Sequence, residues 1–167
     1  MGFPVRSTAL GMALRTVPTL DVPAGAELAQ ITNQVGVDAF AEIHRDVFRA
    51  DGRDLAAVRQ FAHHRVLLAP GASAVIARLD GVPSACAMVI HSGSTAGIYW
   101  VATKPTARRR GLGAVVTTAA ARIAFDDGAD VVVLQATPAG VPVYERLGFK
   151  PFTTYERLLL PAATSSR

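Results

Sequence analysis

The sequence predicts an α/β domain built on a mixed sheet, and two stretches of the chain carry this prediction. In the first, an apolar run over residues 95–103 leads into a helical segment over residues 111–127 and then into a second apolar run over residues 130–136. A strand, a helix and a strand in this order form a right-handed βαβ unit with two parallel strands. In the second, two β-prone runs flank Asp80 and Gly81, a dipeptide suited to a tight antiparallel turn. The sheet is therefore expected to contain both kinds of pairing.

Length and composition suit one packed domain, since the chain has 167 residues and 50% of them are hydrophobic. We expect residues 1–25, which contain three prolines and no clear period, to form an irregular arm with one short strand near residues 19–22. The domain itself is predicted over residues 26–160, and residues 161–167 are expected to be a frayed tail.

The first half of the domain is predicted to contain a strand and two helices. The strand covers residues 26–32, and Asn33 is placed to cap a helix over residues 34–50. Asp54 is placed to cap the second helix, over residues 55–64. The apolar face expected for the first helix consists of Val35, Phe40, Ile43, Val47 and Phe48. The polar residues expected mostly to face water are Glu42, His44, Arg45 and Asp46.

The second half is predicted to alternate between β-prone runs and helices. The run over residues 130–136 is continuously apolar, which is typical of a strand buried on both faces. The remaining elements are, in order, hairpin strands over residues 73–79 and 82–91, a short helix over residues 141–146, and two closing strands over residues 149–154 and 155–160.

Charge and cysteine content narrow the function classes. The formal net charge is +4, but 15 of the 17 basic residues are Arg, a bias that with the many Ala residues is typical of a GC-rich bacterial genome. Outside residues 108–110 the basic residues are scattered, without the aromatic spacing of a nucleic-acid surface. We therefore expect a polyanionic small molecule as partner, and no nucleic acid or membrane.

Metal and redox chemistry are not expected. The chain has no zinc-ligand spacing, and the adjacent His63 and His64 point in different directions on a helix. Cys86 is the only cysteine and is expected to be a small buried hydrophobe. No apolar run approaches about 18 residues, so we expect a cytoplasmic protein.

The loop before the helix over residues 111–127 has the character of an anion site. Three arginines at residues 108–110 and two glycines, Gly111 and Gly113, stand where the helix begins. The first helical turn offers unpartnered N–H groups and a partial positive charge, and glycine lets an anion approach the backbone. The dinucleotide fingerprint needs a glycine where Val116 stands, and Gly-Lys-Ser/Thr is absent. The pattern Arg-x-x-Gly-x-Gly remains and predicts a phosphate loop; a solvated surface loop is the alternative.

A second motif, Tyr-Glu-Arg-Leu-Gly-Phe over residues 144–149, lies about thirty residues beyond the glycine loop. In both motifs, and in their order and distance, the chain resembles the GNAT superfamily, the GCN5-related N-acetyltransferases. The resemblance covers residues 73–160 well and the first two helices loosely. It implies the GNAT fold, a mostly antiparallel sheet with a splayed parallel strand pair and about four helices. It also implies an enzyme that transfers an acetyl group from acetyl-CoA to a primary amine by direct attack in a ternary complex.

The resemblance also implies a role for each matching residue. The backbone of residues 101–103 would pair with the pantetheine arm of acetyl-CoA or another short acyl-CoA, and the Val101 N–H would stabilise the oxyanion. Backbone amides and arginine side chains of the loop would hold the pyrophosphate. Tyr144 would be the catalytic general acid that protonates the departing thiolate; a core aromatic of a short helix is the alternative. The expected cofactor-binding residues are Val101, Ala102, Thr103, Arg108, Arg109, Arg110, Gly111, Leu112, Gly113, Ala114 and Thr137.

Two departures from the family pattern leave questions open. The strand over residues 97–102 has no acid, where many members carry the carboxylate that deprotonates the amine, and Thr137 stands where many carry Asn. The candidates for the base are Glu42, His44, Asp46 and His91. A second hypothesis is a non-catalytic acyl-CoA-binding or regulatory module that lost the base, and a third is nucleic-acid binding through residues 108–110. The sequence does not specify the acceptor, although the lack of an acidic cluster disfavours a polycation, and it leaves a homodimer open.

Overall fold

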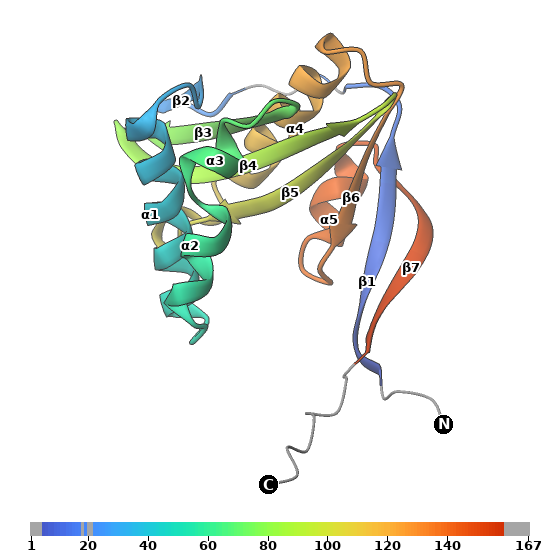
Figure 1. The fold of residues 1–167 in the computed structure, drawn as a ribbon, viewed down its shortest axis with the longest axis horizontal. Coiled ribbons are helices and arrows are strands. Elements are labelled where there is room, and N and C mark those ends of the chain that lie inside the picture. Colours follow the sequence, from blue (N-terminus) through green and yellow to red (C-terminus); the bar gives the residue numbers. More distant parts are fainter. Residues whose placement is uncertain (1–4, 18, 20–21, 159–167) are drawn as a thin grey trace, which may run out of the picture.

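A computed structural model describes residues 5–17, 19 and 22–158 of the chain and shows one seven-stranded sheet with helices on both faces (Figure 1). The strands are β1 (Val5–Leu14), β2 (Ala26–Gln30), β3 (Ala72–Leu79), β4 (Val82–Ser92), β5 (Thr95–Thr103), β6 (Val131–Ala136) and β7 (Lys150–Leu158). The helices are α1 (Gln34–Ala50), α2 (Val58–Phe61), α3 (His64–Leu67), α4 (Leu112–Asp126) and α5 (Val141–Arg146), with 3₁₀ turns η1 (Leu55–Ala57) and η2 (Pro105–Ala107).

The strand order confirms a mixed and mostly antiparallel sheet. The order is β2-β3-β4-β5-β6-β1-β7, and β5 and β6 pair in parallel while the other neighbours pair antiparallel. The parallel pairing joins Thr95–Ile98 to Val131–Leu134 and goes no further, although β5 continues to Thr103. Beyond this point the two strands diverge (Figure 1). This is the splayed parallel pair that was expected.

Alternating side chains of the central strands build a separate core on each face of the sheet. On β4, Cys86 and Met88 pack with α1, α2 and α3, whereas Ala87 and Val89 pack with α4 on the opposite face. Strand side chains point alternately to the two faces, and both faces here are covered by helices, so β4 is buried along most of its length.

Helix α1 begins where it was predicted, and Phe40, Ile43 and Phe48 of its predicted apolar face are buried, but two other predicted positions differ. The Asn33 side chain accepts a hydrogen bond from the Gly36 N–H at 3.1 Å and caps the helix. Val35 is 69% exposed, and His44 is buried with 2% exposure. His44 lies four residues from both Phe40 and Phe48, so it falls on the same stripe of the helix as these buried rings. The predictions that Val35 faces the core and His44 faces water were wrong.

The prediction of an irregular arm over residues 1–25 was also wrong, because residues 5–14 form β1. This strand lies between β6 and β7 and pairs with both. A Cβ on Gly11 would come within 2.5 Å of the Thr153 side chain, so the glycine allows the close approach of β7. The partners of β1 lie more than a hundred residues away, which a local pattern does not reveal. The strand expected near residues 19–22 falls largely outside the described residues, as does the tail over residues 161–167.

Four other predicted elements differ from the structure. The second helix is interrupted at Ala62, whose ψ of 62° is not helical, and α3 follows separately. The two closing strands are one continuous strand, β7. Strand β6 is buried on one face only, since Gln135 on the other face is exposed. Among the helices that the structure describes, none is long and apolar enough to cross a membrane.

We expect Met12→Ala to destabilise the domain by about 2–5 kcal/mol, because the fully buried Met12 fills the core from the centre of β1. Chemical denaturation measures the free energy of unfolding. The control is Val35→Ala at an exposed position, with an expected cost below about 0.5 kcal/mol. Equal costs for the two variants would contradict a structural role for β1.

Candidate active site

A cavity of about 550 Å³ opens where β5 and β6 diverge. Because the ladder between these strands ends at Ile98, side chains from both strands and from α5 surround the space instead of pairing. Its lining consists of Arg53, Ile98, Tyr99, Trp100, Val101, Leu134, Gln135, Thr137 and Tyr144. Three of these, Val101, Thr137 and Tyr144, are among the site residues expected from the sequence.

The wall formed by β5 is distorted at Trp100. Trp100 has a φ of 52°, in the left-handed region that bulky residues rarely adopt, and the register with β4 shifts between Cys86 and Met88. The indole stacks on Phe61 of α2 with ring centroids 3.5 Å apart and an interplanar angle of 6°. The stack holds the bulge against the helical layer, and the next residue, Val101, lines the cavity.

A second cavity, of about 320 Å³, lies at the start of α4. It adjoins the first cavity. Val101 of β5 and Tyr144 of α5 line the first cavity, and Thr103 and Val143 of the same two elements line the second. Its lining consists of Thr103, Arg108, Arg109, Gly111, Leu112, Gly113, Ala114, Val143 and Arg146.

The backbone of this second cavity is rich in free donors. Within the part of the chain that the structure describes, no hydrogen bond uses the amide N–H groups of residues 109–114. Gly111 caps α4 with a φ of 78°, and a Cβ on Gly113 would approach Thr103 Oγ1 to 3.4 Å. A run of unpaired amides beside a helix N-terminus and accessible glycines suits a phosphate group.

The remaining assigned residues differ in how they reach these cavities. The side chains of Ala102 and Leu112 are buried in the two cores, so only their backbone groups face a ligand. Arg110 is exposed and lies outside the lining of both cavities. Two lining cations, Arg53 and Arg146, were not singled out from the sequence. Arg146 stands two residues after Tyr144 in the second motif and could have been found there, whereas no local pattern marks Arg53.

Tyr144 is held in place by contacts on both sides of its ring. The ring packs edge-on against Phe149 at a centroid distance of 5.9 Å, and a Cβ on Gly140 would lie 2.8 Å from Tyr144 Cε2. Burial raises the pKa of Tyr144 above its usual value of 10.0, so its hydroxyl is protonated at neutral pH. The group is therefore suited to donating a proton.

The two acidic candidates for the general base, Glu42 and Asp46, are ion-paired. Lys104, at the end of β5, has a side chain only 8% exposed; its Nζ donates to Glu42 and lies 3.2 Å from Asp46. Burial acts to lower the pKa of Lys104, but the bonds to the two carboxylates outweigh burial and raise the pKa above 10.5. These carboxylates fix the start of the loop to α1.

Helix α1 holds the loop at a second point further along. The Arg108 Nη2 lies 3.9 Å from Asp51 at the end of α1, and the Arg108 Nε donates to the Thr103 carbonyl at 3.4 Å. Both interactions tie the guanidinium to protein groups while one side of it still lines the second cavity.

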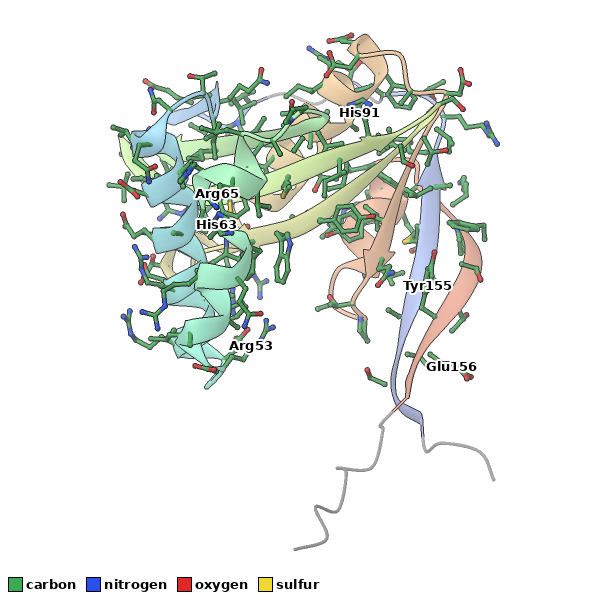
Figure 2. All side chains as sticks on the ribbon, in the orientation of Figure 1. Arg53, His63, Arg65, His91, Tyr155 and Glu156 are labelled. Atoms are coloured by element: carbon green, nitrogen blue, oxygen red, sulfur yellow. The ribbon has the colours of Figure 1, made fainter. Side chains whose placement is uncertain are left out.

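The two histidine candidates lie apart from the cavities. The His44 Nδ1 donates to the Phe40 carbonyl at 3.1 Å, and burial lowers the pKa of His44 from 6.5 to about 4 even though the carbonyls of Phe40 and Trp100 act to raise it. His44 is therefore neutral beneath the Trp100 bulge. His91 lies near Asp127, at the end of the sheet away from the bulge (Figure 2).

The mixed sheet with its splayed parallel pair, β5 and β6, is the fold of the GNAT acetyltransferase class. The model of the Acetyltransferase (GNAT) family matches residues 37–149, and the chain belongs to this family. A search of curated proteins gave no significant match.

Several solved structures are similar to the chain. A GCN5-related N-acetyltransferase from Kribbella flavida has a TM-score of 0.73 and 25% identity over 92% of this chain and 58% of that one. A second, from Sphaerobacter thermophilus, has a TM-score of 0.73 and 15% identity over 93% of this chain and 51% of that one. The chain thus spans little more than half the length of these two. A GCN5-related N-acetyltransferase from Ralstonia eutropha has a TM-score of 0.61 and 23% identity over 83% of this chain and 99% of that one.

We expect Lys104→Met to destabilise the fold by about 1–3 kcal/mol, because it removes the cation between two partly buried carboxylates. The raised pKa sets the pH range of this contribution: it is fully present below pH 10.5 and is lost as pH rises through the higher folded-state pKa. Denaturation from neutral to alkaline pH measures it. The control, Arg49→Met, removes an exposed partner of Asp46 and is expected to cost below about 1 kcal/mol. Equal effects of the two variants would contradict the anchoring role.

Proposed function

We propose that the protein is an acetyl-CoA-dependent N-acetyltransferase that acts on a primary amine. The observation that supports this most directly is that two cavities lie side by side along β5 and α5. One offers unpaired backbone amides and arginines at a helix N-terminus, and the other leads along an unpaired strand edge to the Tyr144 hydroxyl. A long ligand with a charged diphosphate at one end and a reactive group at the other matches this layout.

The residues present fit an acyl-CoA. The amides of residues 109–114, with Arg109 and Arg146, would hold the pyrophosphate, and the free β5 edge over residues 101–103 would take the pantetheine arm as an added strand. Thr137 would contact the same arm through its hydroxyl. When bound, the cosubstrate supplies an acetyl group activated as a thioester.

The chain contributes two groups to the transfer. The N–H of Val101, placed beside the Trp100 bulge, would stabilise the negative charge that develops on the carbonyl oxygen. The Tyr144 hydroxyl would give its proton to the departing thiolate. Because its pKa is raised, this proton is available throughout the neutral and mildly alkaline range.

The amine would lose its proton to solvent rather than to a side chain. Among the described residues, no carboxylate or histidine lines the cavity around Tyr144, and the four candidate bases are engaged or remote. Only the neutral amine attacks, so the rate would rise with pH toward the pKa of the amine itself.

Release of free thiol from acetyl-CoA in the presence of amines tests the proposal. We expect Tyr144→Phe to lower kcat by about 100-fold or more, because the variant keeps the ring but loses the general acid. Acetyl-CoA affinity, measured by calorimetry, should change little. The wild-type rate should increase with pH and then decline only above pH 10, where the raised pKa of Tyr144 is approached.

The matched control is Tyr155→Phe, which removes the same hydroxyl from an exposed ring on β7, away from the cavities (Figure 2). It should leave kcat unchanged. Acetyl-CoA binding without turnover of any amine would instead support the non-catalytic acyl-CoA-binding module.

Gly140→Ala tests the placement of the Tyr144 ring. The φ of Gly140 is −83°, which alanine adopts without strain, so the effect would come from the added Cβ 2.8 Å from Tyr144 Cε2. We expect kcat to fall about 10- to 100-fold, as for a small displacement of a catalytic group, with little change in acetyl-CoA affinity. In the Tyr144→Phe background the same substitution should have almost no further effect on kcat. Additive losses would show that Gly140 acts independently of the hydroxyl.

A further inference from the structure

The cavity around Tyr144 carries one formal charge among its described lining residues, and that charge is Arg53. This residue follows α1 and lies at the end of the helical layer (Figure 2). Its guanidinium carbon sits 3.8 Å from the centroid of the Phe48 ring, a cation–π contact that holds the group while leaving its N–H donors free. Arginine stays protonated at any working pH, so the charge is permanent.

The acids nearest to Arg53 along the chain are each engaged by another group. Asp46 pairs with Lys104 and Arg49, Asp51 lies beside Arg108, and Asp54 accepts from the Ala56 N–H at 2.8 Å to cap η1. Among the residues that the structure describes, no carboxylate lies within 4.0 Å of the Arg53 guanidinium. A planar cation that faces a cavity without a partner is suited to a carboxylate brought by a ligand.

The rest of the wall near Arg53 is aromatic. Trp100 is 40% exposed although one face of its indole is stacked on Phe61, and Tyr99 is 45% exposed. The Tyr99 ring lies over Gly97, where a Cβ would come within 2.5 Å of its hydroxyl. Exposed rings that line a cavity offer a surface for an apolar or aromatic group.

We propose that the acceptor is a primary amine that also carries a carboxylate and an aromatic body, the pattern of an aromatic α-amino acid. The inference rests on the proposed acetyl transfer. Arg53 binds the carboxylate through paired N–H donors, the aromatic body packs against Trp100 and Tyr99, and the amine faces the position next to Val101. Polycationic amines are disfavoured by the same guanidinium.

The chemistry balances without a further reactant. The amine nitrogen forms a bond to the acetyl carbon, the bond from this carbon to sulfur breaks, and the sulfur takes the proton of Tyr144. The attacking amine is already neutral and releases one further proton to solvent as the amide forms, and Tyr144 is reprotonated from solvent. Nothing is oxidised or reduced. The product is an N-acetyl amino acid that keeps its carboxylate.

Thiol release with matched acceptors tests this substrate class. L-phenylalanine, phenethylamine and L-phenylalaninamide share the ring and the amine, and only the first has a carboxylate; spermidine represents the polycations. We expect kcat/KM for L-phenylalanine to exceed that for the other three by about 10- to 100-fold. Arg53→Gln should remove most of this preference, and Arg53→Lys should keep part of it, because lysine retains the charge without the planar fork.

The matched control is Arg59→Gln, on an exposed arginine of α2 that does not line the cavity. It should leave both rate and preference unchanged, and circular dichroism melts confirm that each variant folds. Equal rates for phenethylamine and L-phenylalanine, a preference for spermidine, or a preference that survives in Arg53→Gln would each overturn the inference while leaving acetyl transfer in place.

Direct binding separates the inference from the proposed function. Calorimetry with N-acetyl-L-phenylalanine and N-acetylphenethylamine needs no turnover. The wild type should bind N-acetyl-L-phenylalanine more tightly than N-acetylphenethylamine, and Arg53→Gln should lose this preference. That result would support the carboxylate site even if no amine were acetylated, and only the proposed acetyl transfer would then be rejected. Equal binding of the two ligands, or binding of neither, would reject the carboxylate site.

Discussion

Backbone pairing between β5 and β6 stops at Ile98, and the candidate site depends on this interruption. Past this point β5 keeps β4 on one side, and no strand among the described residues pairs with its other side. The polar groups of this free edge face a cavity instead of a neighbouring strand. The bulge at Trp100 lies on the same segment and is fixed by the stack on Phe61. An open strand edge is usually a liability in a folded protein. Here the free edge lines the cavity next to α5, where the proposed pantetheine arm would pair with it as an added strand.

Acids of α1 form ion pairs with the phosphate loop, and Arg53 remains as the charged residue in the lining of the cavity around Tyr144. Lys104 and Arg108, on either side of η2, are tied to acids of α1, and this attaches the phosphate loop to the opposite layer of the domain. The acids Glu42, Asp46 and Asp51 are thereby paired with these two cations. Arg53 is left to face the cavity, and the site is positive at both ends. One set of contacts thus supports both the loop geometry and the proposed preference for an anionic acceptor.

Elements that local chemistry specifies were predicted well, and elements that depend on distant partners were not. Helix α1 has an Asn33 cap, and its bounds match those predicted. The bounds of α5 also match those predicted. Strand β1 was missed because its ladder to β6 and β7 closes over more than a hundred residues, and no turn or period within residues 5–14 indicates it. The polarity of His44 predicts exposure to water, but its position on the stripe shared with Phe40 and Phe48 decides its burial.

The same distinction explains which half of the site the sequence revealed. Phosphate recognition uses consecutive amides, and a single loop with Gly111 and Gly113 supplies them, so the motif and the cavity coincide. The acceptor end is assembled from β5, β6 and the turn after α1, and Phe61 of α2 supports it by stacking on Trp100. Because the bulge reorients the chain by a left-handed residue, side-chain alternation along β5 does not predict which residues face the cavity. A local motif can therefore report the cosubstrate, while the acceptor has to be inferred from packing between distant segments.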